Sequence, residues 1–128
     1  ARRVEGEKRE LERTLSFTDS LDGISCALAC PAHNILPLLT RHFKSRFGGQ
    51  AWLVYDLRRN YGIFWHGGQM ELVGLQQETL RSFATPAAWD KAGIPDVFRN
   101  CRLQALLLPK VLHKPRTAKE PEPIRSAV

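Results

Sequence analysis

The stretch Trp52–Leu75 constrains the fold more than any other part of this sequence. Apolar and aromatic residues dominate it, and two turn-forming segments, Arg58–Tyr61 and Gly67-Gly68, interrupt it. A Gly-Gly pair between β-prone runs is typical of a two-residue hairpin. The pattern therefore predicts an antiparallel β-meander with strands at Trp52–Leu57, Ile63–His66 and Gln69–Leu75.

The clearest helix is predicted over Pro31–Phe47. Asn34 is a favourable N-cap residue, and Pro37 falls in the first turn, where a missing N–H costs little. Gly48-Gly49 then ends the helix. The apolar residues recur at helical spacing and predict one buried stripe: Ile35, Leu38, Leu39, Phe43 and Phe47.

The remaining elements are predicted to be short. Leu15–Ala29 has the pattern of two strands joined by a turn at Ser20–Gly23. Helices are expected at Glu78–Phe83 and from Thr85-Pro86 to Lys91 or Ala92, followed by an irregular piece from Ile94-Pro95. Leu103–Leu108 is apolar and compatible with either a short helix or a strand.

These elements predict one α+β domain over residues 15–109, in which a small antiparallel meander sheet of about five strands packs on two or three helices. Residues 1–14 are dense in charge and are expected to form the end of a surface helix. Residues 110–128 are basic and rich in proline, and they are expected to be a disordered tail.

Composition narrows the class of partner. The chain has 128 residues, a formal charge of +6 and a pI near 9.7, which favours an acidic partner such as nucleic acid. No apolar run approaches the roughly 20 residues that span a bilayer, so no membrane partner is expected. Three cysteines without a framework spacing are compatible with a reducing cytoplasm.

The meander also carries the best candidate for a binding surface. Arg58 and Arg59 are predicted at a loop tip, where they can contact phosphates, with Tyr61 or Trp65 placed to stack on a base. The alternative is that the aromatic residues are core pairs and the arginines are solvated turn residues. Arg99, Asn100 and Arg102 form a second basic patch, whose alternative is a solvated connector.

Three histidines and one aspartate are candidates for acid–base chemistry. His33 beside the predicted helix start can contact an anion or exchange a proton, and the alternative is simple helix capping by Asn34. Asp56 can pair with His42 or His66, and the alternative is a salt-bridged turn with the arginines that follow it. His33, His42 and Asp56 are therefore the catalytic candidates.

A metal or cofactor site is not predicted. Cys26, Cys30 and His33 have neither the spacing of a CxxC knuckle nor a second cysteine pair to complete a zinc site. The sequence also lacks a P-loop, a GxGxxG fingerprint, an HExxH motif and a GxSxG motif. A self-contained enzyme with a familiar cofactor is therefore not expected.

Several of these positions also carry a family resemblance, over roughly Leu15 to Lys110. The matching residues are Asp22-Gly23-Ile24, Pro31, His33-Asn34, Leu38-Leu39, His42-Phe43, Arg46-Phe47, Trp52–Asp56, Arg58-Arg59 and Tyr61-Gly62. A weaker match continues through Trp89, Ile94-Pro95, Arg99-Asn100, Arg102–Gln104 and Pro109-Lys110. The chain resembles the C-terminal part of bacterial DNA metabolism or DNA repair proteins of unknown mechanism. Such domains are encoded beside a radical-SAM protein or fused to a uracil-DNA glycosylase-like domain.

The resemblance implies a bacterial DNA repair context but assigns no catalytic residue. The first hypothesis is an accessory nucleic-acid-binding module of a repair or modification system. The second is an enzyme acting on DNA or nucleotides, and the third is a scaffold for a radical-SAM or glycosylase partner. The residues expected to contact nucleic acid are Arg46, Arg58, Arg59, Tyr61, Trp65, Arg99, Asn100 and Arg102.

Overall fold

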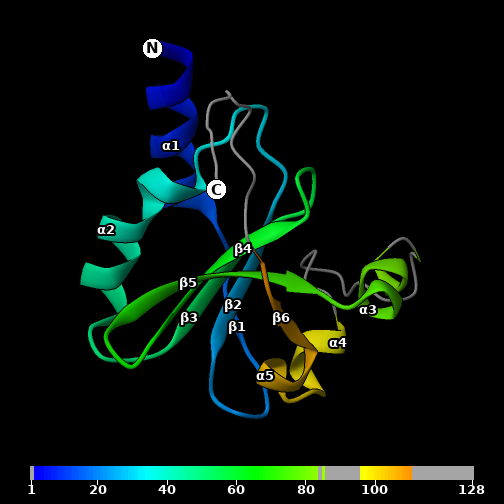
Figure 1. Ribbon diagram of the computed structural model, residues 1–128. Helices are drawn as coiled ribbons and strands as arrows, with labels where there is room; N and C mark the ends of the chain where they lie inside the picture. Colours follow the sequence, from blue (N-terminus) through cyan, green and yellow to red (C-terminus); the bar gives the residue numbers. More distant parts are fainter. Residues whose placement is uncertain (1, 84, 86–95, 111–128) are drawn as a thin grey trace, which may run out of the picture.

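One six-stranded sheet forms the centre of the protein, in the order β1-β2-β3-β4-β5-β6 (Figure 1). The computed structural model describes residues 2–83, 85 and 96–110. The strands are β1 (Thr18–Asp19), β2 (Ser25–Ala29), β3 (Trp52–Asp56), β4 (Tyr61–His66), β5 (Gln69–Leu75) and β6 (Leu107–Pro109). The predicted α+β fold class is confirmed.

Helices cover both faces of this sheet. One face is covered by α1 (Arg2–Thr14) and α2 (Leu36–Phe47), and the other by α3 (Gln77–Ser82), α4 (Asp96–Arg99) and α5 (Leu103–Leu106) (Figure 1). Because side chains alternate along a strand, β3 supplies Trp52 and Val54 to the α2 face and Leu53 and Tyr55 to the opposite face. This is the alternation that the sequence predicts.

The predicted meander is formed by β3, β4 and β5. The first turn has Asn60 at a φ of 57°, and the second has Gly67 and Gly68 at 58° and 79°. These left-handed conformations are the reason for Asn and Gly at those positions.

The sheet also contains a parallel pair that the meander prediction did not include. β2 lies beside β3 from Ser25↔Trp52 to Ala29↔Asp56, and α2 forms the crossover between the two strands. Parallel neighbours need such a crossover connection, whereas a hairpin can join only antiparallel ones. As a result, the C-terminal ends of β2 and β3 lie together near the start of α2.

The α2 face has an aromatic core. Phe43 and Trp52 are fully buried with ring centroids 5.8 Å apart, and Phe17 meets Phe43 edge-on at 5.1 Å. Burying one such side chain contributes about 2–3 kcal/mol, so these contacts hold α2 on the sheet. Leu38, predicted in the buried stripe, is 46% exposed instead.

Some predicted boundaries were wrong or lie outside the described residues. α2 begins at Leu36 with Ile35 as its N-cap, so Asn34 does not cap it. The segment after Pro95 is the short helix α4 rather than irregular, and Leu103–Leu108 contains both a helix, α5, and the start of β6. Apart from Thr85, the helix expected from Thr85-Pro86 to Lys91 or Ala92 lies outside the described residues, as does the tail beyond Lys110.

Candidate nucleic-acid interface

The C-terminal ends of β2 and β3 carry a network of polar side chains. Asp56 is fully buried, and its carboxylate accepts hydrogen bonds from the backbone N–H groups of Arg58 and Arg59 at 2.9 and 3.0 Å. The Arg59 guanidinium donates to Asp56 Oδ2 and to the carbonyl oxygens of Pro31 and Ala32. Arg59 therefore ties the β3–β4 turn to the loop before α2.

Glu7 binds the same loop from α1. Its carboxylate accepts the backbone N–H groups of Ala32 and His33 and lies 2.9 Å from His33 Nδ1. The Ala32 hydrogen bond, followed by the contact with His33, holds the pKa of Glu7 below its ordinary value of 4.5. An ionised Glu7 is thus part of the contact between α1 and this loop.

A hydrogen bond between the side chains of Asn34 and Tyr61 also belongs to this polar network. The Tyr61 hydroxyl donates to Asn34 Oδ1, and burial, with the nearby Asp56 charge, raises the pKa of Tyr61 to about 12. Only 1% of Tyr61 is exposed, so its ring has no face available for a nucleic-acid base. Tyr61 belongs to the core, which is the alternative that the sequence left open.

The expected acid–base arrangement, in which Asp56 orients a histidine, is not formed. Within the described part of the chain, Asp56 hydrogen bonds to neither His33 nor His42. His33 pairs with Glu7, and His42 Nδ1 lies 3.9 Å from Glu12. His66 pairs with Glu71 at 2.9 Å on the opposite face of the sheet.

Arg58 is exposed at the tip of the β3–β4 turn, as predicted. Lys110 lies at the same end of the sheet, because its ammonium group donates to the carbonyl oxygen of Asn60. Two cations therefore lie near this turn, whereas the guanidinium of Arg59 is occupied by its internal hydrogen bonds.

The second predicted basic patch, Arg99, Asn100 and Arg102, lies on the face of the sheet opposite α2. Arg99 and Asn100 are exposed at the end of α4, and Arg102 is exposed as the N-cap residue of α5. Asp22 caps α5 by accepting the backbone N–H groups of Leu103 and Gln104 at 2.9 and 3.0 Å. The predicted binding residues consequently occupy several separate places rather than one surface.

The hydrogen bonds of Asp22 also shift its pKa. Burial by itself favours the neutral acid, but the Ser20 hydroxyl and the Gln104 and Leu103 amides outweigh it and lower the pKa of Asp22. The Asp22-Gly23 turn thus joins the start of β2 to α5, which is distant in sequence.

A shallow basic and aromatic depression lies between α2 and β4. Arg41, Lys44, Ser45, Gly48 and Trp65 line it. The Lys44 ammonium lies 5.1 Å from the centroid of the half-buried Trp65 ring, within the range of a cation–π contact.

Arg46 is exposed on the same helix and covers the edge of the aromatic core. Its guanidinium carbon lies 5.3 Å from the Phe47 ring centroid and 5.4 Å from that of Phe17. Arg46 and Trp65, both predicted, therefore lie on the α2 side of the sheet.

Arg41 and Lys44 were not among the predicted binding residues. Helical periodicity already places both on the solvent side of α2, three residues apart and therefore adjacent on its surface. What the sequence does not show is that β4 brings Trp65 beside them, because that contact depends on how α2 packs across the sheet. We define Arg41, Lys44 and Trp65 as the α2 patch.

Two further features of the described residues concern metal binding and the crossing of a membrane. The described part of the chain contains no group of three or more His, Cys, Asp or Glu side chains placed to hold a metal ion. Among the described helices, none is long and apolar enough to cross a membrane.

Exposed apolar side chains bear on the scaffold hypothesis. In the described residues the large ones are Leu21, Leu38, Met70 and Leu108, which lie in a turn, in α2, in β5 and in β6. Because they come from four different elements, they do not by themselves define an interaction patch.

Comparison with known proteins identifies the family but not an activity. Neither the curated proteins nor the solved structures contain a match to this chain. A protein-family model described as a domain of unknown function, DUF4130, matches residues 1–115. That range includes every described element from α1 to β6, and the chain therefore belongs to the DUF4130 family.

Proposed function

We propose that this domain is a nucleic-acid-binding module that holds a phosphate backbone on the α2 patch. The observation that carries the proposal is the placement of Lys44 beside the half-buried Trp65 ring, with Arg41 in the same depression. Cations bind phosphates and an aromatic face stacks on a base, which is the combination found in single-strand binding sites.

Charge and position support this location. The sequence carries a formal charge of +6, and Arg46 lies on the same helix as Arg41 and Lys44. A basic patch within a basic domain attracts nucleic acid over long range before contact is made. Arg58 and Lys110 are candidates for further phosphate contacts at the far end of the sheet.

The proposal includes a biological context that the sequence resemblance suggests. We infer an accessory role in a bacterial DNA repair or modification system, in the cytoplasm, with DNA as the ligand. A radical-SAM protein or a uracil-DNA glycosylase-like protein is the proposed protein partner, and the module itself supplies DNA binding rather than catalysis.

The direct test is fluorescence anisotropy with labelled single-stranded DNA, duplex DNA and uracil-containing duplex, each across a salt series. The proposal predicts binding whose affinity falls steeply with salt, because each phosphate contact releases condensed counterions. Absence of binding to all three DNAs at low salt would contradict it. Preference for the single strand would support a stacking role for Trp65.

A Trp65→Ala variant separates stacking from charge. Removing a base stack is expected to weaken single-strand binding by about 1–3 kcal/mol while the salt slope stays unchanged. Met70→Ala is the matched control, since Met70 pairs with Trp65 across the β4–β5 hairpin and is 45% exposed.

A further inference from the structure

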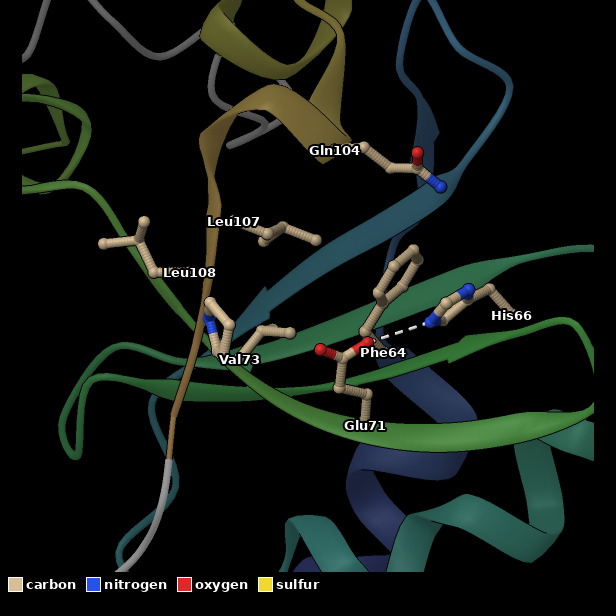
Figure 2. Close-up of a pocket in the computed structure, with 8 residues that line it drawn as sticks. Phe64, His66, Glu71, Val73, Gln104, Leu107 and Leu108 are labelled. Atoms are coloured by element: carbon tan, nitrogen blue, oxygen red, sulfur yellow. Dashed lines mark hydrogen bonds and ion pairs between the residues drawn. The ribbon is translucent and has the colours of Figure 1, made fainter.

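A second pocket lies on the opposite face of the sheet from the α2 patch. Phe64 and Val73 form its floor on β4 and β5, Leu107 forms a wall on β6, and Gln104 projects over it from α5, whereas the Leu108 side chain points to the other side of β6 (Figure 2). Its walls are mainly apolar, which is typical of small-molecule sites.

The polar rim of the pocket is held in place. The His66 ring stacks on Phe64 with centroids 4.3 Å apart and planes 14° from parallel. His66 Nε2 lies 2.9 Å from Glu71 Oε1, as the dashed line in Figure 2 shows. This pair fixes the Glu71 carboxylate beside the aromatic floor, although both side chains remain partly exposed at 40% and 44%.

Two polar groups at this pocket have hydrogen-bonding capacity left over. Within the described residues, Glu71 uses only Oε1, and the side-chain amide of Gln104 has no hydrogen bond. A carboxylate oxygen accepts, and an amide both donates and accepts. A complementary ligand therefore has an N–H group that donates to Glu71 and, beside it, a donor or acceptor that hydrogen bonds to the Gln104 side-chain amide.

The volume limits the size of that ligand. The pocket has a volume of about 260 Å³. This is below the range of sites that enclose drug-sized ligands, so the pocket encloses one flat ring system, and the rest of a longer ligand lies outside it.

We propose that this pocket binds a single planar heteroaromatic ring bearing an amino group, the chemistry of adenine, cytosine and guanine. The ring lies against the apolar walls, and its amino group donates to the free oxygen of Glu71. Uracil and thymine carry no amino group, and their N3–H donor lies between two carbonyl oxygens that a carboxylate repels, so both are disfavoured. The base can come from a free nucleoside or from an unpaired nucleotide in a strand, the second source resting on the proposed function.

Nucleosides provide the first test, because they lack the phosphate that the α2 patch would bind. Adenosine, cytidine and uridine are titrated separately into the ¹⁵N-labelled chain, and the amide resonances are followed by NMR. We expect saturable shifts at Val73, Leu107 and Leu108 with adenosine or cytidine, and about tenfold weaker binding of uridine.

Variants identify the groups responsible. Glu71→Gln is expected to weaken adenosine or cytidine binding about tenfold or more, since it removes a hydrogen bond to a charged group. Glu78→Gln removes an exposed carboxylate from α3, outside the pocket, and serves as the control of equal charge. Leu107→Ala is expected to weaken binding by shortening the apolar wall. Leu108→Ala is its control, because the exposed Leu108 side chain points to the other side of β6 (Figure 2).

The proposal is overturned if no nucleoside at millimolar concentration shifts the pocket amides, or if uridine binds as well as cytidine and Glu71→Gln changes nothing. Oligo-dA and oligo-dT distinguish the source of the base, because both carry phosphates but only dA carries the amino group. Nucleoside binding without DNA binding would reject the proposed function alone. DNA binding without shifts at the pocket amides, for nucleosides and oligo-dA alike, would reject the pocket alone.

Discussion

Arg59 Nη1 lies 3.0 Å from Asp56 Oδ2, and the same guanidinium donates to the carbonyl oxygens of Pro31 and Ala32. The Asp56 side chain is 0% exposed, whereas that of Arg59 is 27% exposed. A buried carboxylate needs such a partner, because leaving it charged and unpaired is costly. Arg59 therefore has a structural role that its neighbour Arg58 does not share.

Replacing Arg59 by Ala is expected to destabilise the fold by about 3 kcal/mol, because it leaves Asp56 buried without its cation. Arg58→Ala is the matched control and is expected to change stability by about 0.5 kcal/mol or less, since the Arg58 side chain is exposed. Urea unfolding followed by circular dichroism measures both. Equal effects would contradict the structural role of Arg59.

Gly62 lies where no side chain fits. A Cβ atom at this position would be 2.7 Å from Tyr55 Cδ2 and 3.0 Å from the Val54 carbonyl oxygen. The Tyr55 hydroxyl accepts the backbone N–H of Leu75, which limits how far the ring can move. Gly62→Ala is therefore expected to cost about 1–3 kcal/mol in thermal unfolding.

Gly49→Ala provides the control for that substitution, because a Cβ there meets nothing within 4 Å. Its effect is expected within about 0.5 kcal/mol. A Gly62→Ala protein as stable as Gly49→Ala would show that β3 and β4 are not packed as described.

The contact of Glu7 with the loop before α2 predicts a pH dependence. The pKa of Glu7 is lowered on folding, so its contribution is fully present above its ordinary value of 4.5 and disappears as the pH falls through the lower folded value. Glu7→Gln should be less stable than the wild type at pH 7, and the difference should shrink below pH 4.5.

Thermal unfolding of both proteins between pH 7 and pH 3 measures this difference. Glu10→Gln removes a carboxylate from the exposed side of the same helix, where among the described residues it pairs only with Arg13, and is expected to show no such convergence. A Glu7→Gln difference that stays constant with pH would contradict the prediction.

The three cysteines are expected to react at different rates. Cys26 is buried, its thiol donates to the Thr18 carbonyl oxygen, and burial raises its pKa from 9.0 to about 12. Cys30 is exposed and Cys101 is partly exposed, with its pKa also raised by burial. Because the thiolate is the nucleophile, iodoacetamide at pH 8 should modify Cys30 first and Cys26 only after unfolding.

Peptide mass spectrometry over a time course identifies the order. Rapid modification of Cys26 in the folded protein would show that β2 is more accessible than the structure indicates.

The parts of the fold that the sequence predicts are those specified by nearby residues. Alternation along Trp52–Leu57 and the Gly67-Gly68 turn are local, and the meander they predict is confirmed. The pairing of β2 with β3 depends on the path of α2, so no local pattern specifies it. Asn34 was expected to cap α2 because of its type, but the Tyr61 hydroxyl, distant in sequence, binds its side chain instead.

The candidate site likewise has features that the sequence predicts and features that only the packing of the chain determines. Arg58 is exposed as predicted, but sequence cannot show that Arg59, the next residue, turns inward to Asp56 and the Pro31 carbonyl. The sequence also could not show that Lys44 contacts the Trp65 ring, because α2 and β4 meet only in the folded protein. Residue types predicted a basic and aromatic surface, whereas the packing of α2 across the sheet determines which residues form it.

The α2 patch is tested most directly by the salt dependence of DNA binding in the double variant Arg41→Ala/Lys44→Ala. Its slope of log affinity against log salt should be smaller than that of the wild type by about two units, one for each phosphate that the variant no longer neutralises. Arg9→Ala/Arg13→Ala removes the same charge from α1 and should keep the wild-type slope. An unchanged slope and affinity in the α2 double variant would contradict the account.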